Sequence, residues 1–196
     1  AGAGIGGGGV ESEWMYSGRI VINDGMIEAT GGADYNGFCG AAGIGAGSSD
    51  SSSATFSDDL TIEITAGTVK AQGGTSAAGI GGSVNGASGS IEISGGNITA
   101  TGGVDDVWAG AGIGGGDNGS SGSIHIGGDA KITAIAYGAA AAIGGGGCGR
   151  STEIIIEGEA DVTAYGSRYG AGIGAGGDTS GYSGVLSCGS ITLNSS

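Results

Sequence analysis

The chain repeats one short pattern six times, and this repetition limits its fold more than any other feature. The motif A-G-I-G, or a near copy of it, places isoleucines at Ile5, Ile44, Ile80, Ile113, Ile143 and Ile173. Consecutive copies are 30 to 39 residues apart. Repeats of this length are typical of solenoids, propellers and other stacked arrays.

Two further apolar patterns follow each copy, and a short turn that contains glycine separates them. The first pattern is I-x-I, at Ile20/Ile22, Ile62/Ile64, Ile91/Ile93, Ile124/Ile126, Ile154/Ile156 and Ile191/Leu193. The second is V/I-x-A, at Ile27/Ala29, Val69/Ala71, Ile98/Ala100, Ile132/Ala134 and Val162/Ala164. Apolar residues that alternate with polar or small ones indicate strands. Residues 1–196 are therefore predicted to form a single all-β domain, a parallel β-solenoid of about six three-sided coils.

The composition agrees with this fold and excludes several function classes. Glycine contributes 52 of 196 residues and suits tight corners, because it accepts a positive φ without a Cβ clash. The net charge of −14, with 19 acids against five bases, argues against a nucleic-acid partner. No apolar run reaches the length of a membrane-spanning helix, so membrane insertion is not expected.

The inserted segments of the repeat carry most of the bulky aromatic residues. Two corners of the predicted coil accept insertions, whereas the link from I-x-I to V/I-x-A hardly changes in length. Insertions in solenoids are often binding loops. The functional hypothesis is therefore a set of ligand-contacting rings, as in sugar binding. The alternative is that the rings cover the solenoid ends or pack the loops onto the body. The rings are Trp14, Tyr16, Tyr35, Phe38, Phe56, Trp108 and Tyr182.

The clearest copies of the repeat, in residues 77–103 and 110–134, follow the unit GAGIGGG…SGSIxIxGGxITATGG. This unit resembles the glycine-rich repeats of large secreted or surface proteins of Gram-positive and gut bacteria. The resemblance implies a right-handed parallel β-helix and an extracellular or cell-surface location. Some of these repeats carry a carbohydrate-binding label. General strand twist also favours the right-handed coil.

No catalytic or metal-binding motif stands out. The only histidine, His125, lies between Ile124 and Ile126 and is expected to point outward. Acids occur as Asp58-Asp59, as Asp105-Asp106 and as a cluster of Glu157, Glu159 and Asp161. Carboxylates about 5–9 Å apart could hydrolyse a glycoside, but solvated acids that limit lateral aggregation are the favoured interpretation. No cofactor is expected, and incidental Ca²⁺ in an acidic loop stays open.

Covalent modification is the remaining chemistry that the sequence suggests. Cys148 and Cys188 fall at the same corner of neighbouring coils and are candidates for a disulfide, whereas Cys39 is remote from both. Asn97, Asn118 and Asn194 each begin an N-glycosylation triplet, which would be an acceptor in a eukaryotic secretory context.

The ends of the predicted rod suggest its partner. Neither end carries a helical or polar cap, and open solenoid ends expose apolar columns and unpaired backbone. We therefore expect a non-catalytic extracellular structural or adhesive module that assembles end to end with itself, or that stacks on neighbouring repeats. One alternative is a carbohydrate-binding module that uses the loop aromatics on glycans. The other is a polysaccharide lyase or glycoside hydrolase.

Overall fold

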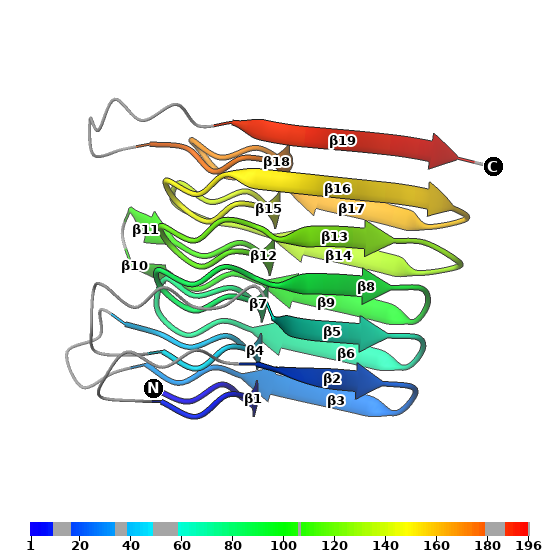
Figure 1. Ribbon diagram of the computed structural model, residues 1–196, viewed down its shortest axis with the longest axis horizontal. Helices are drawn as coiled ribbons and strands as arrows, with labels where there is room; N and C mark the ends of the chain where they lie inside the picture. The colour runs from blue at the N-terminus through cyan, green and yellow to red at the C-terminus, as the bar shows by residue number, and fades with distance from the viewer. Residues whose placement is uncertain (10–16, 34–38, 49–58, 106, 179–186, 196) are drawn as a thin grey trace.

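A computed structural model shows three parallel sheets that wrap around one axis (Figure 1). The structure describes residues 1–9, 17–33, 39–48, 59–105, 107–178 and 187–195. Each of the first five coils contributes one strand to each sheet, the sixth contributes a strand to two of them, and neighbouring strands of a sheet come from successive coils. This confirms the predicted three-sided solenoid.

The three sheets differ in strand length. The short sheet is built from β1 (Ile5–Gly6), β4 (Ile44–Gly45), β7 (Ile80–Gly81), β12 (Ile113–Gly114), β15 (Ile143–Gly144) and β18 (Ile173–Gly174). The front sheet is built from β2 (Gly18–Ile22), β5 (Leu60–Ile64), β8 (Ser90–Ile93), β13 (Ser123–Ile126), β16 (Ser151–Gly158) and β19 (Cys188–Ser195). The back sheet is built from β3 (Met26–Thr30), β6 (Thr68–Gln72), β9 (Asn97–Thr101), β14 (Lys131–Ile135) and β17 (Asp161–Tyr165).

The strand register aligns the repeated motifs coil by coil. Ile113 pairs with Ile80 on one side and with Ile143 on the other. In the front sheet, Ile124 lies between Ile91 and Ile154. In Figure 1 the front strands run from left to right and the fainter back strands return, while the chain rises from its N-terminus at the bottom, so the coil is right-handed.

The aligned isoleucines form the hydrophobic core. Ile44, Ile62, Ile98 and Ile124 are among the fully buried side chains, and alanines fill the narrower positions between such columns. Outward residues of the same strands remain partly or fully exposed, as the alternating burial of β14 illustrates. Because a single coil has no partner for its apolar side chains, this core exists only through stacking.

The short sheet depends on a column of glycines. Gly45, Gly81, Gly114 and Gly144 all have φ between +130° and +138°, a range that residues with a Cβ rarely adopt. An ideal Cβ on Gly114 would lie only 1.9 Å from the carbonyl oxygen of Gly144. Glycine is therefore required for the coils to approach each other on this side.

One irregular hairpin interrupts the coil pattern. Strands β10 (Val104–Asp105) and β11 (Trp108–Ala109) pair antiparallel where the third coil passes from the back sheet to the short sheet. We name this passage the back–short corner, and the passage from the short to the front sheet the short–front corner. In the described ranges, no helix is long and apolar enough to cross a membrane.

Candidate interaction surfaces

A hollow among the described residues runs along the short–front corner. Its volume is about 710 Å³, and its lining residues come from the third to the sixth coil. We call it the hydroxyl groove, because serine and threonine provide most of its wall. The lining residues are Ala87, Gly89, Ser90, Ser120, Ser121, Gly122, Ser123, Arg150, Ser151, Thr152, Glu153 and Ser187.

The sequence explains why the groove opens at this place. The connection from β12 to β13 is short, whereas the connections from β4 to β5 and from β18 to β19 are longer. The groove therefore lies between two coils that carry insertions at the same corner. Its floor is built from glycine and small polar residues, which leave room that larger side chains would fill.

Hydrogen bonds hold only part of the hydroxyl lining. Thr152 donates its Oγ1 hydrogen to the carbonyl oxygen of Ser121, and Ser121 Oγ accepts from the Thr152 backbone N–H at 3.3 Å. By contrast, Ser151 Oγ is buried and has no hydrogen-bond partner. A buried hydroxyl without a partner is costly, and this oxygen lies behind the groove surface and not on it.

The groove also contains one charge of each sign. Arg150 and Glu153 are both exposed, and neither takes part in the two ion pairs found among the described residues. Their charged groups are thus available to an occupant of the groove. The guanidinium offers donors only, and the carboxylate accepts.

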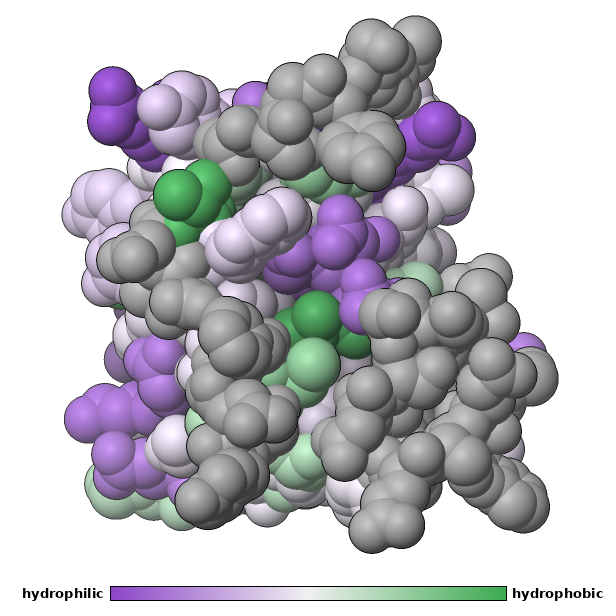
Figure 2. All heavy atoms as spheres, turned by 90° about the vertical axis from the view of Figure 1, so that its left-hand side faces the viewer, coloured by the Kyte–Doolittle hydropathy of each residue, from purple (hydrophilic) through white to green (hydrophobic). Residues whose placement is uncertain are grey.

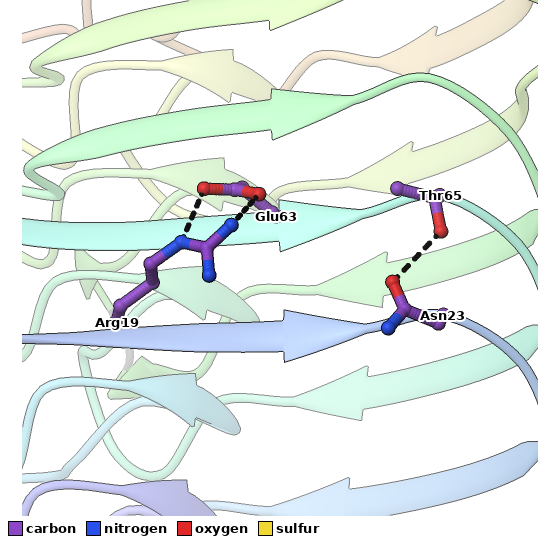
Figure 3. Close-up of polar contacts among 4 residues, drawn as sticks. All are labelled: Arg19, Asn23, Glu63 and Thr65. Atoms are coloured by element: carbon purple, nitrogen blue, oxygen red, sulfur yellow. Dashed lines mark hydrogen bonds and ion pairs between the residues drawn. The ribbon is translucent and has the colours of Figure 1, made fainter.

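Polar ladders cross the front sheet away from the groove. Arg19 Nε donates to Glu63 Oε1 at 2.7 Å, and its Nη2 donates to Oε2 at 2.5 Å (Figure 3). Beside this pair, Thr65 Oγ1 donates to Asn23 Oδ1 at 3.1 Å. The hydrogen bond and charge of Glu63 raise the pKa of Arg19, and the hydrogen bond from Arg19 lowers the pKa of Glu63. Arg19 is exposed and Glu63 is only partly buried, so this ion pair adds little to stability.

Among the described residues, Asp117 is the acidic side chain that is buried. Its burial was not predicted from the sequence. Its Oδ2 accepts from Asn118 Nδ2 at 3.1 Å, whereas its Oδ1 has no partner. Burial raises the pKa of Asp117 to about 7, although the backbone N–H groups of Ala109 and Asn118 oppose the shift. A Cβ on Gly147 would lie 2.4 Å from Oδ1, so the neighbouring coil needs glycine there.

Exposed aromatic side chains lie at the back–short corner. Trp108 is 43% exposed in β11, and Tyr137 and Tyr169 are exposed at the same corner of the next two coils. The guanidinium of Arg168 lies over the ring of Tyr169, 5.1 Å from the ring centre. Figure 2 looks onto the side where β10 and β11 lie and shows hydrophobic residues there as small separate patches among polar ones. The other predicted rings, Trp14, Tyr16, Tyr35, Phe38, Phe56 and Tyr182, lie outside the described residues.

Cys148 and Cys188 are not bonded to each other in the structure, and their disulfide stays a prediction. The Cys148 thiol donates to Asp178 Oδ1 at 3.7 Å, and Cys188 pairs in register with Ser151. Cys148 belongs to the turn before β16 and has a φ of +55°. The two cysteines therefore occupy the same corner of neighbouring coils, as expected, but at different positions along it.

The other predicted groups are dispersed over the surface. Asn97, Asn118 and Asn194 are exposed, and their glycosylation stays a prediction. His125 points outward, as predicted, and its Nε2 lies 2.9 Å from Glu157 Oε1. Asp58 and Asp106 lie outside the described residues. Within the described ranges, no three acids, histidines or cysteines gather as a metal site would require.

The last described coil presents an apolar surface. Ile191 and Leu193 of β19 are 36% and 64% exposed, although Ile154, the register partner of Ile191, is completely buried and Ile156, the register partner of Leu193, is partly buried. In the first coil, Ile5, Ile20 and Ile27 are likewise only partly buried. Residues of the core pattern thus reach the surface at both ends of the stack.

Comparisons with known proteins agree with the geometry. A family model described as "Beta helix repeat" matches residues 20–48, 62–84, 91–117 and 154–177, together just over half of the chain. The matched segments begin in or near the front strands and extend past the short strands. No curated protein and no solved structure matches the chain.

Proposed function

The chain belongs to the beta helix repeat family, and on this premise we propose that it is a non-catalytic extracellular module with a structural and adhesive role at a cell surface. Its partner in this proposal is a second copy of itself, stacked end to end, or a neighbouring repeat that stacks in the same way. The glycine-rich repeat unit of residues 77–103 and 110–134, which resembles repeats of bacterial surface proteins, supports the extracellular location.

The exposed core residues of the last coil are the observation that carries this proposal. Leu193 is 64% exposed at a position where every preceding coil buries or half-buries an isoleucine. Burial of an apolar side chain contributes about 25 cal/mol per Å². Stacking of a further coil on β19 would cover Leu193 and Ile191 and continue the core.

The backbone at the two ends supports the same arrangement. The short and front sheets begin with β1 and β2 and finish with β18 and β19. All their strands are parallel, so the outer edge of β19 offers the hydrogen-bonding pattern that β16 offers to β19. A copy placed head to tail would extend both sheets, in a heterologous contact that does not close on itself.

A charge at Leu193 tests this assembly. We expect the unmodified protein to form rods or fibres in electron micrographs and to show a sedimentation coefficient that rises with concentration. Leu193→Asp should abolish both effects, because a buried unpaired carboxylate opposes stacking. The control is Thr192→Asp, because Thr192 points outward from the same strand. An unmodified protein that stays monomeric at all concentrations, or a control that dissociates as Leu193→Asp does, would refute the assembly.

Carbohydrate binding through aromatic rings is a second candidate. The exposure of Trp108, with Tyr137 and Tyr169 at the same corner, favours it, because planar aromatic faces suit contact with a partly apolar ligand. A polysaccharide pull-down tests this candidate, and the signal should be lost in Trp108→Ala. The polysaccharide lyase and glycoside hydrolase alternatives stay predictions.

A further inference from the structure

We propose that the outer edge of β17 is a docking site for one extended polypeptide strand of a partner repeat, a strand with the V/I-x-A pattern of the back sheet. This inference goes beyond the stacking of copies proposed above, because it specifies the type of strand with which a fully fitting partner begins. It concerns the back sheet and uses neither Ile191 nor Leu193.

The three sheets end unequally in the described part of the chain. The short and front sheets each contain six strands and finish with β18 and β19, whereas the back sheet contains five and finishes with β17. In Figure 1, β19 is the uppermost front strand, and β17 is the uppermost of the fainter back strands. A position for one strand is therefore open beside β17, level with the sixth coil.

The inward side chains of β17 are incompletely covered on that side. Val162 and Ala164 are only partly buried. Their register partners in the preceding coil, Ile132 and Ala134, are 2% and 0% exposed. A strand added beside β17 would cover Val162 and Ala164 as β17 itself covers Ile132 and Ala134.

The backbone of β17 is open on the same side. The Asp161 N–H donates to the carbonyl oxygen of Ala130 at 2.8 Å, and the Tyr165 carbonyl oxygen accepts from the Ala136 N–H at 3.1 Å. Both hydrogen bonds run toward the preceding coil. Backbone groups of alternate residues in a parallel strand face opposite neighbours, so those of Val162 point toward the open position. Such an edge is a template for another strand.

A second copy of the chain does not fill this position when it stacks head to tail. Within a coil, the chain passes from the short sheet to the front sheet and then to the back sheet. A copy with β1 on β18 and β2 on β19 therefore places its β3 two strand spacings from β17, which is about 10 Å. The junction contains a gap one strand wide, between Val162 and Ala164 on one side and Ile27 and Ala29 on the other.

The core of the back sheet selects the V/I-x-A pattern for the missing strand. In all five back strands the first inward position carries valine or isoleucine, and the second carries alanine. The alanines of the four preceding strands are 0–4% exposed: Ala29, Ala71, Ala100 and Ala134. A larger side chain at the second position would overfill this column. A strand of the I-x-I type therefore does not fit beside β17.

Charge on the outward face favours a neutral or basic partner strand. Asp161 is exposed at the start of β17, and it pairs in register with Lys131 of the preceding coil. A lysine in the same register on the open side would form a second pair of opposite charges, which is favourable across neighbouring strands. The net charge of −14 disfavours an acidic segment.

A peptide with the sequence of residues 95–103, which is β9 with its flanking glycines, tests the proposal. Fluorescein-labelled peptide is titrated with Leu193→Asp protein, in which stacking is opposed, and fluorescence anisotropy reports binding. We expect saturable binding that a further Val162→Asp change weakens about tenfold, because a carboxylate then faces the apolar gap. A further Thr163→Asp change, at an outward position of the same strand, should leave binding unchanged.

Variant peptides test the same site without a change in the protein, so they remain informative where Val162→Asp unfolds the last coil. Ala100→Ile in the peptide should weaken binding about tenfold or more, because isoleucine overfills the alanine column. Asn97→Lys in the peptide should strengthen binding, because it places a cation beside Asp161. Absence of binding, equal binding by the Ala100→Ile peptide, or equal binding to a folded Val162→Asp protein would overturn the proposal.

Sedimentation of the unmodified protein separates this site from the proposed stacking of copies. The peptide should raise the sedimentation coefficient at a fixed protein concentration, because it fills the gap at each junction. Peptide binding to Leu193→Asp, together with an unmodified protein that never assembles, would exclude the stacking and support the β17 site. Assembly without peptide binding would exclude the β17 site alone.

Discussion

Interior and terminal coils share one sequence pattern, but the apolar side chains of that pattern are buried in the interior coils and exposed in the last one. Ile124 and Ile126 of β13 are completely buried, whereas Ile191 and Leu193, their counterparts in β19, are 36% and 64% exposed. The strands are built from the same I-x-I motif and follow the same register. Burial is therefore a property of the stack and not of the coil, and each coil depends on its neighbours for stability.

The glycine column offers the sharpest way to test this difference, with the largest expected effect. Gly114 and Gly174 have nearly equal φ, +137° and +136°. A Cβ on Gly114 would meet the Gly144 carbonyl oxygen at 1.9 Å, but a Cβ on Gly174 would meet Cys188 Sγ first, at 3.2 Å. Gly114→Ala should lower the free energy of unfolding by more than about 4 kcal/mol, and Gly174→Ala by about 1–2 kcal/mol.

Urea denaturation followed by circular dichroism measures both variants. The shared positive φ gives them the same conformational cost, so the difference between them reports the collision with the next coil. Equal losses of stability in the two variants would contradict close stacking on the short side.

Asp117 allows a second comparison, between equivalent turn positions of neighbouring coils, with a smaller expected effect. The fourth coil has Asp117 where the fifth has Gly147. Because burial raises its pKa from 3.8 to about 7, the folded state resists losing a proton that the unfolded state gives up readily. Stability should fall as pH rises from about 4 to about 7, by at most about 4 kcal/mol, and then level off.

Asp117→Asn should remove this loss, because the amide stays neutral. Thermal unfolding at pH 5 and pH 8 measures the stability of the variant and of the unmodified protein. We expect the variant to exceed the unmodified protein in stability at pH 8 and to approach it at acid pH. The control is Asp129→Asn, on an exposed turn. A variant that is less stable than the unmodified protein at pH 8 would show that the partners of the ionised carboxylate outweigh the cost of its burial.

The repeated motifs were sufficient to predict the fold. Ile80, Ile113 and Ile143 were placed in one column from their spacing alone, and the register confirms this. Periodicity is informative here because a one-residue slip would move every apolar residue to the wrong face.

The surfaces could not be predicted so well, since they depend on turns that have no periodic pattern. The sequence marked Trp108 as an insertion aromatic, but not that its segment forms the β10–β11 hairpin. Asp117 belongs to no periodic pattern in the sequence, and its burial follows from how the Gly147 turn packs over it. The hydroxyl groove combines small residues from four coils, and each serine is unremarkable by itself.

In-register stacking is the central claim, and an experimental density map at side-chain resolution tests it most directly. The account predicts Ile80, Ile113 and Ile143 in one column, with successive Cα atoms about 4.8 Å apart and Gly81, Gly114 and Gly144 beside them. A map in which these isoleucines lie in separate parts of the molecule, or in which the repeats pair antiparallel, would contradict it.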